Sequence, residues 1–285
     1  MIKIRSFLLV FICFFFFSSF AQNAHVAINI LAGKVLMVDS TEVTYKAFSS
    51  DTILGKNRQL FSVMLNDNVQ FKFVNRDSIA HNVFIESWIE GINIPAFSTA
   101  DTTIICNKTG VFSVEDIDEN ERYLGLSGSL VVSVNEPTYF YWNLKELQSS
   151  FSNLLDESMP INFNEYQPNY FMINGRSNPD IGLDSLAKIR GKVGDTLRLV
   201  IHNGGNSVHS LHFHGYHFKI ISSNLKPFAI GWEKDTYAVL AGENVVVEIV
   251  PDKPGEYPVH DHNLVATTAN NIYPNGMFTT LVITP

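Results

Sequence analysis

Most of the chain after residue 22 alternates between hydrophobic and polar positions and shows no helical repeat. Segments such as HVAINILAGKVLMVD, STEVTYKAFSS and NRQLFSVMLNDNVQFKFVNRD follow this pattern, and turn signals such as Asn66-Asp67 and Asn75-Arg76-Asp77 separate them. Side chains alternate between the two faces of a strand, so these runs predict half-buried strands. Many short strands of this kind predict an all-β protein built from sandwiches.

One segment interrupts the strand pattern, between residues 136 and 165. Its large apolar residues recur at spacings of three and four, which predicts one short amphipathic helix; they are Leu144, Leu147, Phe151, Leu154 and Leu155. The chain of 285 residues is long enough for two domains of ordinary size. We therefore expect a first domain over 22–135, a linker with a short helix over 136–165, and a second domain over 166–285.

The N-terminus has the composition of a secretory signal peptide. Lys3 and Arg5 precede a run of large apolar residues, and small residues follow in Ser19-Phe20-Ala21. The apolar run is shorter than a typical membrane span. We expect residues 1–21 to be removed, with an uncleaved anchor as the alternative, and we expect a periplasmic or secreted protein without a membrane span in the mature chain.

Cysteine content and charge restrict the possible disulfides and partners of the protein. Removal of the signal peptide takes Cys13 with it and leaves Cys106, so an intramolecular disulfide is excluded in the mature chain. Cys106 ends an apolar run and is predicted to be a buried free thiol. The formal net charge is −8 and the mature chain has no basic run, which argues against nucleic acid and anionic membranes as partners.

Histidines are concentrated in two short motifs of the second domain. The first is VHSLHFHGYHF, from Val208 to Phe218, and the second is His260-Asp261-His262. Residues two apart share a face of a strand, so His212 and His214 form one pair, and the histidines that flank Asp261 form another. Neutral imidazoles suit copper, zinc, iron and nickel. Two such pairs in one domain predict a metal site of four histidines rather than a metal-free, histidine-rich surface.

These motifs resemble the last cupredoxin domain of the multicopper oxidases, which carries HPxHxHG, then HCH, then a Gly-Met pair. The corresponding residues here are His209 to Gly215, His260 to His262, and Gly276-Met277. The resemblance implies two Greek-key cupredoxin β-sandwiches and copper as the cofactor, although four histidines can also hold zinc. It also implies metal-ligand roles: His209 and Met277 (axial) for type 1 copper, His212 for type 2 copper, and His214, His260 and His262 for type 3 copper.

The sequence departs from the family at the type 1 site. Asp261 stands where the family has the copper cysteine, and no histidine occurs between Asn263 and Met277. A blue copper site needs a thiolate and two imidazoles, so we predict that this domain has no type 1 copper. Asp261 is predicted to be a polar partner of His209, with a role as a carboxylate ligand as the alternative.

The first domain resembles a cupredoxin more faintly. His81 occupies the position of the first copper histidine, Asp116 that of the copper cysteine, and Leu126 that of the methionine. We therefore expect a scaffold without metal, in which His81 is a core or surface histidine. The acidic run from Glu115 to Glu121 is predicted to be a solvated loop rather than a cation site.

Three functions are compatible with these features. The preferred one is a copper-binding protein with a non-blue site of His212, His214, His260 and His262. The second is a copper-dependent oxidoreductase of the multicopper oxidase type that completes its cluster across subunits, as two-domain relatives do. Those relatives suggest a homotrimer and a small-molecule or protein redox partner. For the shared cluster of such a trimer, the first domain offers only His25 and His81. The third is a metal-free structural or interaction module.

Overall fold

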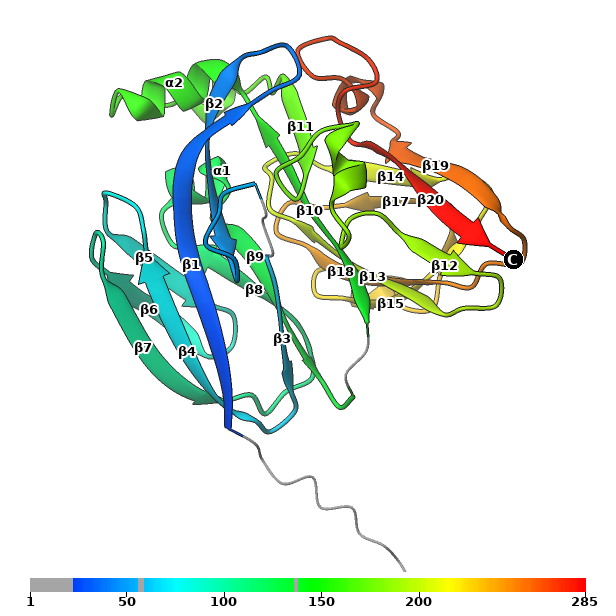
Figure 1. The fold of residues 1–285 in the computed structure, drawn as a ribbon, viewed down its shortest axis with the longest axis horizontal. Helices are drawn as coiled ribbons and strands as arrows, with labels where there is room; N and C mark the ends of the chain where they lie inside the picture. Colours follow the sequence, from blue (N-terminus) through cyan, green and yellow to red (C-terminus); the bar gives the residue numbers. More distant parts are fainter. Residues whose placement is uncertain (1–22, 56–58, 136–137) are drawn as a thin grey trace, which may run out of the picture.

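The computed structural model describes residues 23–55, 59–135 and 138–285, so the predicted signal peptide lies outside the described residues. Two β-sandwiches lie side by side, and the chain passes from the first to the second through strand β10 (Figure 1). The all-β fold predicted from the alternating pattern is confirmed. Within the described ranges, no helix is both long and apolar enough to cross a membrane.

The first domain contains two sheets that face one another across an apolar core. The β1 sheet has the order β2-β1-β4-β7, and its strands are β1 (Asn23–Leu36), β2 (Glu42–Ser49), β4 (Asn68–Asn75) and β7 (Thr99–Ile105). The β8 sheet has the order β3-β9-β8-β5-β6, and its strands are β3 (Leu60–Met64), β5 (His81–Ile85), β6 (Ile89–Ile94), β8 (Gly110–Asp116) and β9 (Ser127–Ser133). Phe71, Phe73 and Val114 belong to the buried core between them.

The second domain repeats this arrangement with two larger sheets. The β13 sheet has the order β11-β10-β13-β18-β15-β16, and its strands are β10 (Tyr139–Leu147), β11 (Tyr170–Ile173), β13 (Leu197–Asn203), β15 (Phe218–Ser223), β16 (Glu233–Lys234) and β18 (Asn244–Ile249). The β14 sheet has the order β12-β20-β19-β14-β17, and its strands are β12 (Arg190–Lys192), β14 (His209–Phe213), β17 (Thr236–Val239), β19 (Gly255–Asp261) and β20 (Phe278–Thr284). Trp142, Phe213 and Leu281 lie in the core between these sheets.

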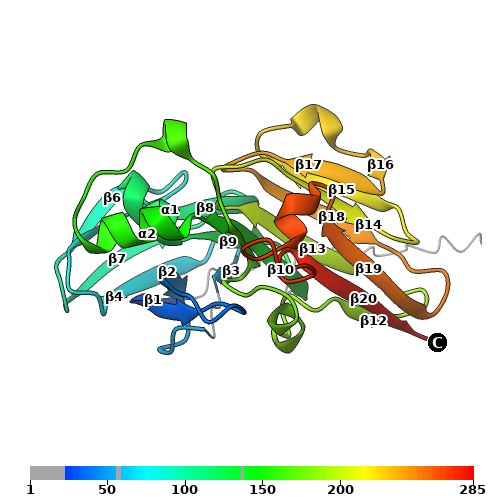
Figure 2. The same ribbon diagram turned by 90° about the horizontal axis from the view of Figure 1, so that it is seen from above.

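Short helices fill the connections. They are α1 (Glu119–Leu124), α2 (Ser149–Asp156) and the 3-10 turns η1 (Phe163–Glu165), η2 (Asp180–Leu183), η3 (Pro227–Ala229) and η4 (Leu264–Thr267). Figure 2 shows α1 and α2 beside one another on the first domain. Tyr123 of α1 and Phe151 of α2 share a buried cluster with Tyr170 of β11, so this cluster joins both domains.

The β8 sheet and the β13 sheet pack against one another at the domain interface. Val131 of β9 lies in one apolar cluster with Tyr141, Val200 and Val246 of the second domain. Hydrogen bonds surround this cluster, because the Asn244 amide donates to Ser113 Oγ at 2.9 Å and its oxygen accepts from Ser129 Oγ at 2.9 Å. The outer face of the β14 sheet is therefore left on the far side of the molecule from the first domain.

The predicted linker helix is correct only for its C-terminal half. Leu144 and Leu147 lie on strand β10, which pairs in parallel with β13 and antiparallel with β11. Helix α2 begins at Ser149. Strand β10 is covered on both sides, by the domain core and by the first domain, so its residues are nearly all buried and the strand alternation disappears from the sequence.

Candidate metal centre

Four histidines of the second domain lie together on the outer face of the β14 sheet. His212 of β14 pairs directly with His260 of β19, and their ring centroids are 5.7 Å apart. His214 lies 4.7 Å from His212 and 5.2 Å from His260. His262 lies 5.7 Å from His212. The structure thus brings together the two predicted pairs, because adjacent antiparallel strands present them on the same face.

Hydrogen bonds orient two of these imidazole rings. Nδ1 of His260 donates to the backbone carbonyl of Asp261 at 2.9 Å, and Nδ1 of His212 bonds to Thr236 Oγ1 at 2.7 Å. Partners of this kind fix the ring and leave Nε2 for a metal ion. Nε2 of His260 lies 3.0 Å from Nε2 of His214.

This donor set fits a metal ion that prefers imidazole. Two ligand nitrogens that each lie about 2.0 Å from one metal ion, at roughly 90 to 110°, are separated by about 3 Å. The 3.0 Å between the Nε2 atoms of His214 and His260 agrees with that separation. The pKa of His214 is lowered by partial burial and by the charges of His212 and His260, which favours the neutral, metal-binding form. His214 and His262 are exposed, so the cluster is accessible.

At the predicted type 1 position, a histidine is hydrogen-bonded to two carboxylates instead. His209 lies on β14 with its side chain inside the domain, where Nδ1 contacts Asp261 Oδ2 at 2.7 Å and Nε2 contacts Glu146 Oε2 at 2.9 Å. All three residues are buried. The expected role of Asp261 as a polar partner of His209 agrees with this geometry.

Charges on this buried triad stabilise one another. Burial lowers the pKa of His209, but the hydrogen bonds and charges of Asp261 and Glu146 outweigh it and raise that pKa to about 9. Burial also raises the pKa of Glu146, but His209 and Lys145 bring it to about 2. Carboxylates contact both ring nitrogens of His209 in this structure, an arrangement that differs from its predicted role as a metal ligand, and that role stays a prediction.

The backbone of Met277 contacts one member of this triad, Asp261. Its carbonyl accepts the N–H of Asp261 at 3.1 Å, and its side chain belongs to the buried core of the domain. A thioether is a weak axial ligand that accompanies a thiolate and two imidazoles. With Asp261 in the cysteine position and His209 held by carboxylates, Met277 acts here as a core residue.

The first domain contains the same histidine–aspartate pair in the same register. His81 Nδ1 contacts Asp116 Oδ2 at 2.8 Å. Val83, two residues after His81, pairs with Asp116, just as Leu211, two residues after His209, pairs with Asp261. The N–H of Asp116 bonds to the carbonyl of Leu126, as that of Asp261 bonds to Met277. The structure thus supports the correspondences inferred from the sequence.

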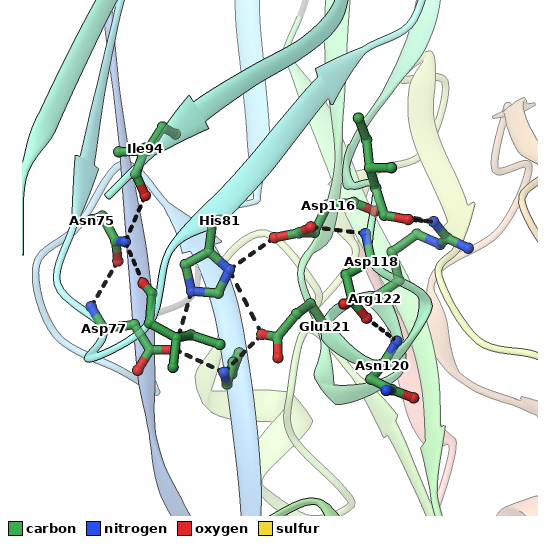
Figure 3. A network of polar contacts seen from close by, with 12 residues as sticks. Asn75, Asp77, His81, Ile94, Asp116, Asp118, Asn120, Glu121 and Arg122 are labelled. Atoms are coloured by element: carbon green, nitrogen blue, oxygen red, sulfur yellow. Dashed lines mark hydrogen bonds and ion pairs between the residues drawn. The ribbon is translucent and has the colours of Figure 1, made fainter. Parts of the chain in front are cut away.

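A larger polar network surrounds His81 in the first domain (Figure 3). Its Nε2 lies 3.1 Å from Asp77 Oδ2, and the ammonium of Lys46 lies 2.7 Å from both Asp77 and Glu121. Asp77, His81 and Glu121 bring three potential ligand atoms within 4.8 Å of one another. The ammonium of Lys46 lies between two of these carboxylates and supplies positive charge at this place.

The prediction for the acidic run of the first domain was wrong in part. Asp116 and Glu121 turn inward, toward His81 and Lys46, rather than into solvent. Asp118 caps helix α1 by accepting the N–H of Asn120 at 2.8 Å. Alternation along β8 placed Asp116 on its core side, and this was the signal that could have identified it.

Glu146 is not among the predicted site residues because its segment was predicted to be helical. Glu146 lies on β10 and is fully buried, together with the neighbouring Lys145, whose pKa burial lowers to about 8. A charged dipeptide inside the apolar run YFYWNLKEL was the available signal, because buried charges require partners.

The remaining histidines lie apart from the cluster. His202 is buried on β13, with Nδ1 at 3.1 Å from Asn244, and burial lowers its pKa to about 4. His217 is exposed in the turn after β14, and His25 is exposed on β1. Cys106 is a buried free thiol, as predicted, and burial raises its pKa to about 11.

Comparison with known proteins supports the relationship suggested by the motifs. Residues 155–284 match the family model described as multicopper oxidase. Among curated proteins, none matches this chain.

Several solved structures share the fold of the whole described chain. A blue copper oxidase from Nitrosomonas europaea superimposes with a TM-score of 0.76 at 22% identity, covering 92% of this chain and 86% of that one. The multicopper oxidase mgLAC gives 0.73 at 20% identity, with 93% and 88% covered. A copper nitrite reductase from Nitrosomonas europaea gives 0.67 at 16% identity, with 92% and 94% covered. The chain therefore has the cupredoxin fold of these proteins, and its second domain matches the multicopper oxidase family.

Proposed function

We propose that this protein binds copper outside the cytoplasm through His212, His214, His260 and His262, without a type 1 copper. The observation that supports this most strongly is the grouping of four imidazoles on one accessible sheet face, with Nε2 of His214 and His260 3.0 Å apart. The structural relatives include a blue copper oxidase and a copper nitrite reductase, and copper leads the divalent metals in affinity for nitrogen ligands.

The residues of the chain determine what such a site does. Bound copper would supply a redox-active centre with an open coordination position. Thr236 and the carbonyl of Asp261 hold two imidazoles in place, and the exposed His214 and His262 leave one side open to a small molecule. The buried His209 keeps its carboxylate partners.

The metal site is tested by copper titration of the mature protein. Metal content is measured by mass spectrometry, and the site is characterised by absorption and paramagnetic resonance. The double variant His212→Ala/His262→Ala should lose binding, whereas His217→Ala, which changes an exposed histidine at the end of the same motif, should retain it. One or two coppers without an intense blue band support the proposal. A strong blue band, or no retained metal, contradicts it, and competition with zinc decides which ion is preferred.

The second candidate is an oxidoreductase that completes its cluster across subunits. The open face of the four histidines favours it, because a second copy could cover this face and contribute His25 from its β1 sheet. Oxygen consumption by the copper-loaded protein, together with its mass in solution, tests this candidate. A copper-loaded monomer without oxygen consumption contradicts it.

Export is tested separately from metal binding. We propose a periplasmic or secreted protein because residues 1–21 have the composition of a signal peptide. Mass spectrometry of protein made in a Gram-negative host should find a mature chain beginning at Gln22 in the periplasm or medium. A full-length chain in the cytoplasm contradicts it.

A further inference from the structure

Glu146 connects the strand between the domains to the loop that leads into the histidine motif. Its Oε1 accepts the N–H groups of Asn206 and Ser207, each at 2.7 Å, and the hydroxyl of Tyr166 at 3.1 Å. A Cβ atom at position 205 would clash with the Glu146 carboxylate, so glycine allows this close approach. One buried carboxylate therefore fixes the loop immediately before β14.

From Glu146 the contacts continue to the end of β19. Oε2 of Glu146 lies 2.9 Å from His209 Nε2, and His209 Nδ1 lies 2.7 Å from Asp261. The other oxygen of Asp261 accepts the N–H of Ser210 at 3.3 Å and that of Asn263 at 2.8 Å. The Asp261 side chain thus joins β14 to the turn that follows β19.

Asp261 stands between two of the four clustered histidines. Its backbone carbonyl accepts Nδ1 of His260 at 2.9 Å, and the N–H of His262 donates to the carbonyl of Ser210 at 2.7 Å. Both histidines are therefore held by the backbone that Asp261 positions. A continuous series of contacts thus runs from the buried triad to His260, whose Nε2 points toward His214.

We propose that Glu146 is a positioning residue for the four-histidine site, acting through His209 and Asp261 on His260 and His262. This inference rests on the proposed function, because it concerns the geometry of a metal bound there. Outer partners of ligating histidines commonly alter metal affinity ten- to a hundredfold. Glu146 differs from such partners in that it contacts none of the four histidines and belongs to the strand that links the two domains.

The test compares Glu146→Gln and Glu146→Ala with the matched control Asp77→Asn. Asp77 contacts Nε2 of His81 in the first domain, as Glu146 contacts Nε2 of His209 in the second. The Glu146 variants should bind the same number of coppers as the wild type, with an affinity about 10 to 100 times lower and a changed copper hyperfine splitting. Asp77→Asn should leave both the affinity and the splitting unchanged.

A second readout does not depend on metal. In the copper-free protein, imidazole nitrogen shifts report the Nδ1–H tautomer of His260, which the Glu146 variants should disturb and Asp77→Asn should not. If the wild type binds no copper, the proposed function fails, and these shifts still test the positioning role. Unchanged affinity, hyperfine splitting and His260 shifts in both folded Glu146 variants would overturn the inference.

Discussion

The two domains share a buried histidine–aspartate pair but differ on the opposite face of the strands that carry it. In the first domain Phe84 pairs with Glu115, at the register where the second domain pairs His212 with His260. The next outward positions are Glu86 and Ile117 in the first domain, and His214 and His262 in the second. The β8 sheet, which carries the first set, packs on the second domain, whereas the histidines lie on a free face.

The two faces of these strands therefore have different roles. The inward pair is present in both domains, so it belongs to the fold, while the outward histidines are confined to the domain whose sheet face is free. His81 takes its second carboxylate from Asp77, which also contacts Lys46, and His209 takes its second from Glu146 on the strand that links the domains. The comparison predicts that substitutions in the inward histidine–aspartate pairs mainly affect stability. Substitutions of the outward histidines should mainly affect metal binding.

Removal of the inward aspartate should have the largest effect, and it should be similar in both domains. Asp116→Ala and Asp261→Ala each leave a buried histidine with one carboxylate partner fewer. Breaking a buried ion pair in this way costs about 3 to 5 kcal/mol. Chemical denaturation should show this loss in each variant. An effect below about 1 kcal/mol in one domain alone would show that the two pairs are not equivalent.

The pH dependence of stability tests whether both histidines are charged. The pKa values of His81 and His209 are each raised to about 9, because their carboxylate partners outweigh burial. A raised pKa contributes stability that is complete below the unfolded value of about 6.5 and is lost as pH rises toward 9. Each histidine should therefore contribute about 3 kcal/mol that disappears in this window.

The range from pH 6.5 to 8 is the most informative part of that window. Lys145, with a pKa lowered to about 8, adds stability as pH rises above 8 and so opposes the histidines there. Denaturation curves should show a falling free energy of unfolding between pH 6.5 and 8. The double variant His81→Gln/His209→Gln should show a flatter slope, and an equal slope would contradict the charged pairs.

Replacement of Lys46 should turn the first domain into a metal-binding one. Lys46→Met removes the ammonium that lies 2.7 Å from Asp77 and Glu121 and leaves them with His81 as three potential ligands. Zinc at 100 times its dissociation constant should then stabilise the variant by about 2.7 kcal/mol. Thermal melts are made in a His212→Ala/His262→Ala background to remove the other site. A zinc-independent melting temperature would contradict the role of Lys46 as an internal cation.

The smallest expected effect concerns the orientation of one outward ring. Thr236→Val removes the hydroxyl that lies 2.7 Å from Nδ1 of His212 and keeps the β-branched shape of a residue on β17. Copper affinity should fall about tenfold, or about 1.4 kcal/mol. Thr280→Val on β20 is the control, and it should leave the affinity as in the wild type. Equal affinity in both variants would show that His212 needs no such partner.

The sequence predicted those parts of the molecule that local patterns determine. Alternation predicted the strands, and the two-residue spacing of the histidines predicted the two pairs that the structure brings together, because side-chain direction along a strand depends on position alone. The pairing of Asp261 with His209 followed from its place in the cysteine position of the motif.

Long-range partners were not predictable in this way. Glu146 reaches His209, and Lys46 reaches Asp77 and Glu121, from distant segments, and the sequence around Glu146 and Lys46 does not identify these partners. Strand β10 was mistaken for a helix because burial on both faces removes the polar alternation that identifies a strand. In each case the missing information was the packing of one domain or sheet on another.

The central claim is that the second domain binds copper on its outer face while both inward histidines stay with their carboxylates. Anomalous diffraction at the copper edge from crystals of the loaded protein tests it most directly. The account predicts copper among His212, His214, His260 and His262, and no copper peak at His81 or His209. A peak at His209, beside Asp261 and Met277, or no peak at the four histidines, would contradict it.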